Sequence, residues 1–519
     1  MSDSFFSLAQ HYHHRTKYDP DTLAQQAQPL DYTRQPVPFK FYQVGVEIDL
    51  KPYLDGDQAV ASEVSPTEAH DWMRLSRLLI NAYGLTAKFP TMSGEMFYLR
   101  SAPSAGGLYP AEVYLVSRGT KLLPAGLYNY QARTHSLWRY WDDHNWGNLQ
   151  RACFWHPALE ATHMALVVTG VFYRSAWRYR DRAYRRICLD TGHLLGNIEL
   201  ASALTDYRPH LIASFADEAM AQLLYLSPDE EGVLAVLPLA DLLAVEQNLA
   251  LTQTIFATPA QTTYEDAPDG QLLHYFHQTT NLPATTNAPN WPSRHPPETD
   301  DDSPLEDKYN FPFCLRVPTQ TAPIPWGNDL SPLETTILRR RSTRQYSGGS
   351  ISFEALKQLL DFTYQPQHYR DQGLDGDPDY CDLGLLQTFL AVSNVEGLES
   401  GCYYYAPRSQ ELRQVRFKQF RPELHYLCLG QELGRDAAAV LFHTADLKAA
   451  TAAYGDRVYR YLHLDAGHLG QRLNLAAIYL GLGVSGIGGF YDDQVNEVLG
   501  IPADEAVIYI TTLGQPANT

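Results

Sequence analysis

The sequence lacks the features that mark membrane, secreted and metal-binding proteins. No uninterrupted apolar run approaches the roughly 20 residues that a membrane-spanning helix needs. No basic segment followed by an apolar stretch opens the chain, so we expect no signal peptide. The six cysteines are scattered without a C-x-x-C pair, which favours reduced thiols and a cytoplasmic location. His11, His13 and His14 have no second cluster at ligand spacing, so we predict surface or packing histidines and no metal site.

Basic residues are too few for a typical nucleic-acid-binding protein. The formal net charge is -19, whereas nucleic-acid binding depends mainly on Lys and Arg that neutralise phosphates. A local arginine cluster can still bind a small anion inside an acidic protein. The 519 residues, 45% hydrophobic and 19% charged, have globular composition and are too many for one ordinary core. We therefore predict two domains, with no nucleic-acid and no membrane partner.

An internal duplication is the most informative feature of the sequence. YRDRAYR at residues 179–185 leads into LDTGHL, and YGDRVYR at residues 454–460 leads into LDAGHL. The same offset of 275 residues (454 − 179) relates GLYNY at 126–130 to GCYYY at 401–405. A looser match relates HYHHRT near the start of the chain to HYFHQT at 274–279. A period this long, occurring twice, indicates two copies of a whole domain.

Each copy mixes helical and strand patterns, which predicts an α+β fold. Two similar halves packed about a pseudo-twofold axis are expected, because a duplicated domain inherits the symmetry of a homodimer. Helical spacing and strand composition predict helices over 74–82 and 354–362, buried core helices over 189–204 and 464–479, and strands over 111–117 and 506–513.

A stretch rich in Pro, Thr, Asn and Asp, from about residue 252 to 329, separates the copies. Its composition suits an irregular connector, yet the segment at 274–279 indicates that the second copy begins inside it. An ordered linker that wraps the other half and a free tether both remain open. The expected boundaries are 1–250 for the first half, 251–329 for the connector and 330–519 for the second half.

Three segments carry candidate binding chemistry. RRSTR at 340–344 follows a short helical lead-in, and its guanidinium and hydroxyl groups can bind an anion, although a solvated basic helix face would look the same. SAPSAGGLYP at 101–110 has small residues that let the backbone approach a flat ligand, or simply form a tight turn. GLGVSGIGGF at 481–490 offers free backbone N–H groups to a ligand, or turns a corner.

Together, PSAGGLYP, RRSTR, LDAGH and GIGGF resemble the motifs of the nitroreductase superfamily, and most closely its SagB/ThcOx-type FMN-dependent azoline dehydrogenases. The resemblance covers about residues 70–245 and 330–515. It implies two nitroreductase-like domains fused as an internal pseudo-dimer, with flavin mononucleotide (FMN) bound at their interface. Further homo-oligomerisation is left open. The implied cofactor-binding residues are Arg340, Arg341, Ser342, Arg344, Gly486, Ile487, Gly488 and Gly489 from the second half, and Pro103, Ser104, Ala105, Gly106 and Gly107 from the first.

The two halves have kept complementary motifs. At the 275-residue offset, the counterpart of PSAGGLYP begins with PDYCD at 378–382, and the counterpart of GIGGF is LIASF at 211–215. Residues 59–63, AVASE, contain no Arg-x-Ser. The reverse pairing would join the PDYCD segment of the second half to the segments at 59–63 and 211–215 of the first half. We expect the carboxylates of this pairing to repel a flavin phosphate. The resemblance therefore implies one FMN per chain.

The same resemblance leaves the catalytic base open. The family's azoline dehydrogenases use a Lys-Tyr pair, whose aligned positions here are Arg178-Tyr179 and Ala453-Tyr454. Because arginine stays protonated, we expect Tyr179 or Tyr454 to donate or relay a proton, with Arg178 lowering the Tyr179 phenol pKa. Each LDxGH segment also holds an Asp three residues before a His, which we interpret as a structural Asp–His pair because both halves have it.

Three functions are consistent with these motifs. The first is an FMN-dependent oxidoreductase that takes a hydride onto flavin N5 from a heterocyclic or peptide-derived, azoline-like substrate, with dioxygen or another acceptor reoxidising the flavin. The second is an NAD(P)H-dependent reductase of nitro compounds or quinones, which would run the flavin in the opposite direction. The third is a non-catalytic flavin-binding or partner-binding scaffold. The sequence does not name the substrate.

Overall fold

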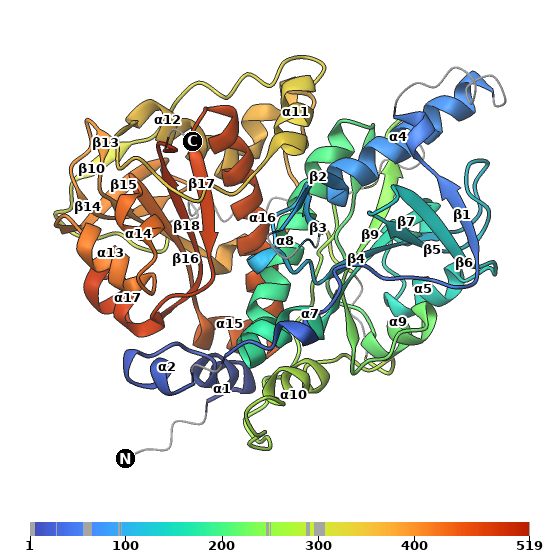
Figure 1. Cartoon of the computed structure of the whole chain (residues 1–519), viewed down its shortest axis with the longest axis horizontal. Helices are drawn as coiled ribbons and strands as arrows, with labels where there is room; N and C mark the ends of the chain where they lie inside the picture. The colour runs from blue at the N-terminus through green and yellow to red at the C-terminus, as the bar shows by residue number, and fades with distance from the viewer. Residues whose placement is uncertain are drawn as a thin grey trace.

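The computed structural model describes residues 6–26, 29–54, 65–91, 94, 96–244, 249, 251–286, 291–294 and 307–517. Two halves of similar architecture lie side by side, and Figure 1 draws the first in blue to green and most of the second in orange to red. Each half contains one large antiparallel sheet with helices packed around it. The predicted α+β fold with two fused halves is therefore confirmed.

The two large sheets follow the same order of strands. The first is β1-β6-β5-β4-β7-β9-β8 and the second is β10-β15-β14-β12-β16-β18-β17. The two predicted strands are present as β4 (Ala111–Ser117) and β18 (Glu505–Gly514). Their companions are β1 (Val46–Asp49), β5 (Gly126–Gln131), β6 (Ser136–Trp141), β7 (Met164–Val171), β8 (Tyr207–Pro209), β9 (Glu231–Asp241), β10 (Arg316–Pro318), β12 (Gln387–Val392), β14 (Gly401–Ala406), β15 (Glu411–Phe417), β16 (Ala439–Asp446) and β17 (Gly483–Ile487).

Two long buried helices form the centre of the molecule, one from each half. They are α8 (Ala183–Ala203) and α16 (Val458–Tyr479), which cover the predicted core helices and begin about six residues earlier. Figure 1 shows them crossing between the halves. The glycines of the two LDxGH segments meet at this crossing, where a Cβ on Gly192 would lie 2.8 Å from the Cα of Gly467. Glycine is required at both positions because the helix backbones approach too closely for a side chain.

Buried ion pairs lock the halves together in a pseudo-symmetric way. Arg182 and Arg185 of the first half bind Asp492 of the second at 2.8 and 2.7 Å. At the 275-residue offset, Arg457 and Arg460 bind Asp217 of the first half in return. The duplicated arginine-rich segment therefore serves the interface.

The beginning of each copy also lies against the opposite half. The backbone N–H of Ala9 in α1 (Leu8–Arg15) donates to Asp456, and that of Leu273 in α10 (Leu272–Thr279) donates to Asp181. The two helices touch through stacked rings of Tyr12 and Phe276, 4.5 Å apart. Of the two alternatives for the connector, residues 251–286 therefore match the ordered, wrapping linker. The connector also contributes β10, which pairs with β15.

The remaining elements complete the two halves. The helix predicted over 74–82 belongs to α4 (Pro66–Tyr83), and that over 354–362 belongs to α12 (Phe353–Tyr364). The others are α2 (Pro20–Gln26), α5 (Trp146–Ala152), α6 (Ala158–Ala161), α7 (Phe172–Tyr179), α9 (Asp217–Leu224), α11 (Ser331–Arg339), α13 (Arg421–Leu427), α14 (Glu432–Asp436), α15 (Leu447–Tyr454), α17 (Asp492–Leu499), the hairpin β2 (Leu85–Pro90) and β3 (Met96–Arg100), and the pair β11 (Ile351–Ser352) and β13 (Val395–Glu396).

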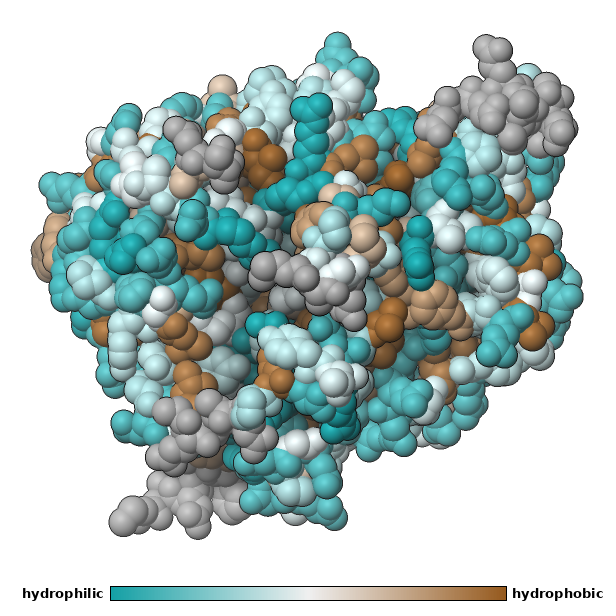
Figure 2. Space-filling model, in the orientation of Figure 1, coloured by the Kyte–Doolittle hydropathy of each residue, from teal (hydrophilic) through white to brown (hydrophobic). Residues whose placement is uncertain are grey.

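The surface, the cysteines and the clusters of possible metal ligands can be compared with the expectations from the sequence. On the face drawn in Figure 2, hydrophobic residues occur in scattered groups among hydrophilic ones. All six cysteine thiols are free, and five of them are buried. Within the described ranges no helix is long and apolar enough to cross a membrane. The described residues also contain no group of three or more His, Cys, Asp or Glu side chains placed to hold a metal ion.

Candidate functional site

A cavity lies where the two halves meet. Both halves contribute to its walls, as the complementary motifs predict. The lining residues are Pro103, Ser104, Ala105, Gly106, Arg186, Leu189, Asp190 and His193 from the first half, and Ser342, Arg344, Asn474, Ser485, Gly486, Gly488 and Tyr509 from the second.

The PSAGGLYP loop is tied to the central helix by one carboxylate. Asp190 on α8 accepts a hydrogen bond from the Ser104 hydroxyl at 2.6 Å and from the Ala105 N–H at 3.1 Å. Burial raises the pKa of Asp190 to about 7, although these hydrogen bonds and Arg186 favour its charged form. The loop turns through Gly106 and Gly107, both at φ +67°. Gly107 does not line the cavity, and a Cβ there would lie 2.6 Å from the Phe97 ring.

The RRSTR segment is extended after α11 ends, so its successive side chains point to opposite sides of the segment. Ser342 and Arg344 line the cavity. Arg341 turns away and donates to the hydroxyl and carbonyl of Thr86 on β2. Thr343 pairs instead with the backbone of Val484 on β17. The predicted binding residue Arg341 therefore lies outside the cavity.

Arg340 of the same segment is buried against the first half, behind the cavity wall, and is not itself among the residues that line the cavity. Its Nε and one Nη donate to the carbonyls of Ser101 and Arg100 at 2.6 and 3.0 Å. Its other Nη is buried and has no hydrogen-bond partner in the described part of the chain. Burial lowers the pKa of Arg340 to about 10, and its charge acts on His193 and Tyr509 in the cavity wall. A buried donor without an acceptor is costly, and a bound anion or carbonyl would satisfy it.

The glycine segment contributes backbone to the cavity. Gly486 and Gly488 line it, whereas Ile487 belongs to the hydrophobic core and Gly489 packs against Leu429. A side chain at Gly486 would overlap the Tyr509 hydroxyl. Among the described residues, the N–H groups of Gly488 and Gly489 donate to no backbone carbonyl, so they remain available to a ligand.

The predicted Asp–His pair of the LDxGH segment is wrong. Asp190 bonds the PSAGGLYP loop, while His193 bonds Gln471 at 3.0 Å and Tyr509 at 2.8 Å. The equivalent Asp465 likewise accepts from the backbone of residues 381 and 382. The spacing does place Asp190 and His193 on one helical face, but each has a nearer partner, Asp190 in the PSAGGLYP loop of its own half and His193 in the opposite half.

A chain of hydrogen bonds fixes the direction in which Tyr509 can bond. The Asn197 amide nitrogen donates to the carbonyl of Ala82, so its oxygen accepts from Gln471. The Gln471 oxygen then accepts from His193 Nδ1. Burial lowers the pKa of His193 to about 3, so the ring is neutral and its Nε2 must accept. Tyr509 therefore donates to His193 and keeps its oxygen lone pairs for a ligand.

Sequence reasoning missed much of the cavity wall. The LDxGH repeat was a signal for Leu189, Asp190 and His193, because it marks the helix on which the halves cross. Arg186 lies in the arginine-rich repeat just before it. Ser485 lies inside the glycine segment at 481–490 but was not itself predicted, and no local pattern marked Asn474 or Tyr509.

The predicted catalytic residues are separated by the fold. The Tyr179 hydroxyl lies 2.8 Å from where a Cβ of Gly106 would be, so it is close to the cavity, and Arg178 is exposed beside it. Burial raises the pKa of Tyr179, outweighing the opposite effects of Arg186 and Arg178, so the expected net lowering is wrong. Tyr454 instead lines a second cavity, where its hydroxyl donates to Asp382 at 2.9 Å.

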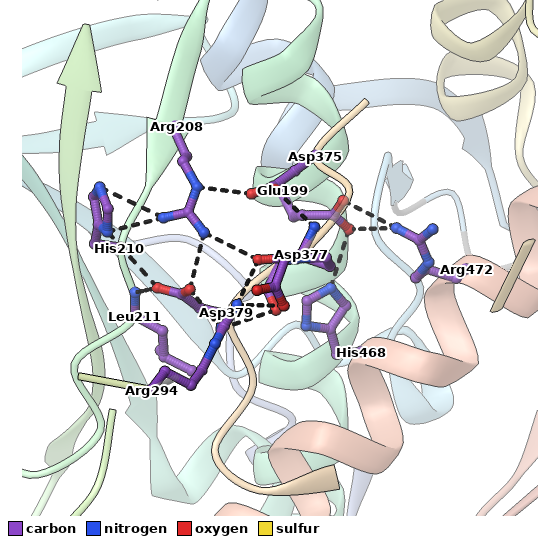
Figure 3. Close-up of polar contacts among 11 residues, drawn as sticks. Glu199, Arg208, His210, Leu211, Arg294, Asp375, Asp377, Asp379, His468 and Arg472 are labelled. Carbon is purple, nitrogen blue, oxygen red and sulfur yellow. Dashed lines mark hydrogen bonds and ion pairs between the residues drawn. The ribbon is translucent and has the colours of Figure 1, made fainter. Parts of the chain in front are cut away.

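That second cavity is the pseudo-symmetric counterpart of the first, because its lining residues Pro378 and Cys381 lie 275 residues after Pro103 and Gly106. Figure 3 shows the ion pairs beside it. Asp379, at the position equivalent to Ser104, binds Arg208 at 3.0 Å and Arg294 at 2.8 Å, and it accepts from the Leu211 N–H at 2.9 Å. Arg208 also binds Asp375 at 2.8 Å. We expected free carboxylates that repel an anion, but these carboxylates are neutralised by arginines.

The two cavities therefore differ in how their polar groups are used. On the side of the second cavity, Glu199 binds Arg472 at 2.9 Å and His468 at 3.2 Å, so these buried groups satisfy one another. At the 275-residue offset, the position equivalent to Glu199 is Asn474 and that equivalent to His468 is His193, and both of these residues line the first cavity. Residues 59–63, where the first half was predicted to lack Arg-x-Ser, lie outside the described residues.

Comparison with known proteins identifies the family. The model of the Nitroreductase family matches residues 74–240 and 337–515, one match in each half. The chain belongs to the nitroreductase family. Family membership makes this tandem nitroreductase-family chain an oxidoreductase, and it agrees with the resemblance that the motifs carry.

Individual relatives support both the family and the tandem arrangement. A crystal structure of a nitroreductase-type protein from Anabaena variabilis is 64% identical, with a TM-score of 0.91 over 98% of this chain and 100% of that one. MJ1384 of Methanocaldococcus jannaschii, described as a nitroreductase, is 32% identical over 33% of this chain and 84% of its own length. The microcin B17-processing protein McbC of Escherichia coli is 29% identical over 24% of this chain and about half (48%) of its own length.

Proposed function

We propose that this chain binds one FMN in the cavity between its halves and acts as an FMN-dependent dehydrogenase of a heterocyclic or peptide-derived, azoline-like substrate. Family membership supports the redox chemistry. The similarity to McbC, which processes microcin B17, supports a peptide-derived substrate. Dioxygen or another acceptor would complete the cycle.

The observation that carries the proposal is the unsatisfied guanidinium of Arg340. It is 2% exposed, and one of its nitrogens has no partner in the described chain. FMN has phosphate oxygens and pyrimidine carbonyls, all of which are acceptors for such a donor. Ser342 and Arg344 stand in the cavity wall on the same segment, so the residues present fit the cofactor.

Bound FMN would supply a ring nitrogen, N5, that accepts a hydride. Arg340 and Arg344 would hold its phosphate or pyrimidine edge, where positive charge favours the anionic reduced state. The free N–H groups of Gly488 and Gly489 would donate to the ring, and Tyr509 would accept from it. Asp190 keeps the PSAGGLYP loop in the shape that covers the opposite edge.

Tyr179 would handle the substrate proton. Because its pKa is raised, the phenol stays protonated at neutral pH and can donate or relay a proton rather than act as a strong base. Arg178 beside it would orient the phenol or the substrate by charge. Tyr454 belongs to the other cavity, so we assign it no part in this step.

A second candidate is an NAD(P)H-dependent reductase of nitro compounds or quinones, which the similarity to MJ1384 favours. The two candidates share the cavity and differ in the direction of electron flow. Rapid bleaching of the oxidised flavin by NADH or NADPH without a heterocyclic substrate would favour the reductase.

The deciding experiment is a visible absorbance spectrum of the purified chain with heat-released FMN measured per chain. We expect about one FMN per chain, lost in Arg340→Ala and kept in Arg341→Ala, which removes the same charge from outside the cavity. No flavin after incubation with excess FMN would refute the enzyme function and leave a scaffold. Two FMN per chain would show that the second cavity also binds.

A further inference from the structure

Arg186 is a buried arginine of the cavity wall that the flavin contacts proposed above do not use. It is 5% exposed, and one of its guanidinium nitrogens donates to the Gly488 carbonyl at 3.0 Å. Its other terminal nitrogen is buried and has no hydrogen-bond partner in the described chain, although the guanidinium lies near enough to Tyr18 to lower the pKa of that phenol. The guanidinium lies 3.8 Å from the centre of the Tyr179 ring, which holds it beside the PSAGGLYP loop.

The charge of Arg186 is not neutralised as its neighbours are. Arg182 and Arg185, on the same segment, bind Asp492 at 2.8 and 2.7 Å. The carboxylate one helical turn along from Arg186 is Asp190, but its oxygens accept from Ser104 and Ala105. A guanidinium in a cavity wall with a free N–H is a site for an oxyanion, because charge-assisted hydrogen bonds to oxyanions are strong.

A second guanidinium lies near the same tyrosine. Arg178 is exposed, and its guanidinium lies 5.7 Å from the centre of the Tyr179 ring. Its Cδ is 3.6 Å from where a Cβ of Gly106 would be, at the cavity-lining loop. Arg178 and Arg186 thus both lie near Tyr179 on the first half, whereas Arg340 and Arg344, proposed for the flavin, belong to the second.

We propose that Arg186, assisted by Arg178, forms an oxyanion subsite for the substrate, so that the preferred substrates carry a carboxylate or a phosphate. This inference rests on the proposed function, because it assigns the second-half arginines to FMN. In a chain of net charge -19, a local cationic pair is what would draw an anionic substrate to this cavity. Tyr179 would then face the substrate between its two anchors.

The alternative is that Arg186 only holds the Gly488 carbonyl in place. The two roles predict different results for matched ligands. If the role is structural, substituting Arg186 should weaken the binding of charged and uncharged ligands alike. If Arg186 forms an oxyanion subsite, the substitution should weaken the binding of the charged ligands only.

The test is calorimetric titration of the FMN-incubated chain with 4-nitrobenzoate, 4-nitrophenyl phosphate and uncharged 4-nitrobenzyl alcohol. We expect at least one of the anions to bind about tenfold or more tightly than the alcohol, and to lose that preference in Arg186→Gln. Arg178→Gln should lose part of it, and Arg186→Lys should retain part. Arg118→Gln, which removes an exposed charge at the far end of β4 from the loop, should retain all of it.

Each outcome separates the subsite from the cofactor. Whichever of 4-nitrobenzoate and 4-nitrophenyl phosphate binds more tightly shows whether the subsite prefers a carboxylate or a phosphate. Equal binding of anions and alcohol by a chain that holds FMN overturns the subsite and leaves the proposed function standing. A chain that takes up no FMN overturns the proposed function, and its titration still shows whether the anion preference exists. If Arg186→Gln lowers the affinity for all three ligands equally, and Arg178→Gln leaves these affinities unchanged, Arg186 has a structural role and the subsite is overturned.

Discussion

Asp190 and Asp465 are pseudo-symmetric carboxylates whose removal should have the same effect on stability, while only the removal of Asp190 should affect flavin binding. Asp190 accepts hydrogen bonds from Ser104 and Ala105 at the first cavity. Asp465 accepts from the N–H groups of residues 381 and 382 at 2.9 and 2.8 Å at the second. Truncating either to Ala removes the acceptor of two partly or fully buried donors, at about 1–3 kcal/mol each.

The size of this loss should depend on pH. Burial raises the pKa of both carboxyls from 3.8 to about 7 in the folded state. Between these values the folded chain binds more protons than the unfolded chain, so this contribution to stability falls as the pH rises. From pH 5 to pH 8 it falls by roughly 2–3 kcal/mol per carboxyl. The cost of Asp190→Ala or Asp465→Ala should therefore shrink by about that amount over the same interval.

Only Asp190→Ala should weaken the binding of FMN. Reordering one freed backbone residue costs about 1–2 kcal/mol, so loss of the loop anchor should lower affinity about tenfold or more. Urea unfolding at pH 5 and pH 8 gives the stability of both variants, and FMN fluorescence titration gives the affinity. Equal loss of FMN in Asp465→Ala would refute the single asymmetric site, and a cost that grows with pH would refute the raised pKa values.

Further substitutions test other parts of the cavity and the interface. Arg340→Ala should lower FMN affinity by about tenfold or more, measured by fluorescence titration, with Arg341→Ala unchanged; equal effects would contradict the placement of Arg340. Gly486→Ala should displace the Tyr509 hydroxyl and reduce FMN occupancy, visible in the absorbance spectrum; full occupancy would show that the cofactor does not contact this strand. Asp492→Ala should leave two buried arginines unpaired and destabilise the chain by about 3–5 kcal/mol in urea, with a loss below about 1 kcal/mol arguing against a buried interlock.

The duplication made the architecture predictable from the sequence. A repeat of the arginine-rich and LDxGH segments at a constant offset requires two copies of one domain, and the α+β class followed from local helix and strand patterns. The predicted core helices and strands match α8, α16, β4 and β18. These elements are long and strongly patterned, so local preference and the final fold agree.

The roles of the repeated residues could not be read in the same way. Arg182 and Arg457 look like surface or ligand-binding residues in the sequence, but each pairs with an aspartate of the opposite half. Gly192 is unremarkable in a helical pattern until α16 crosses it. Such contacts join residues far apart in the chain, and no local signal encodes them.

The sequence by itself determined the duplication, the fold class and the motif residues, because each depends on short segments whose spacing is visible in the chain. Only the tertiary structure decided which of those residues meet. In the folded chain, Arg341 donates to Thr86, Tyr454 lines the second cavity, and Tyr509 of β18 bonds to His193. The physical reason is that the cavity lies between two halves, so its walls are set by how the halves pack.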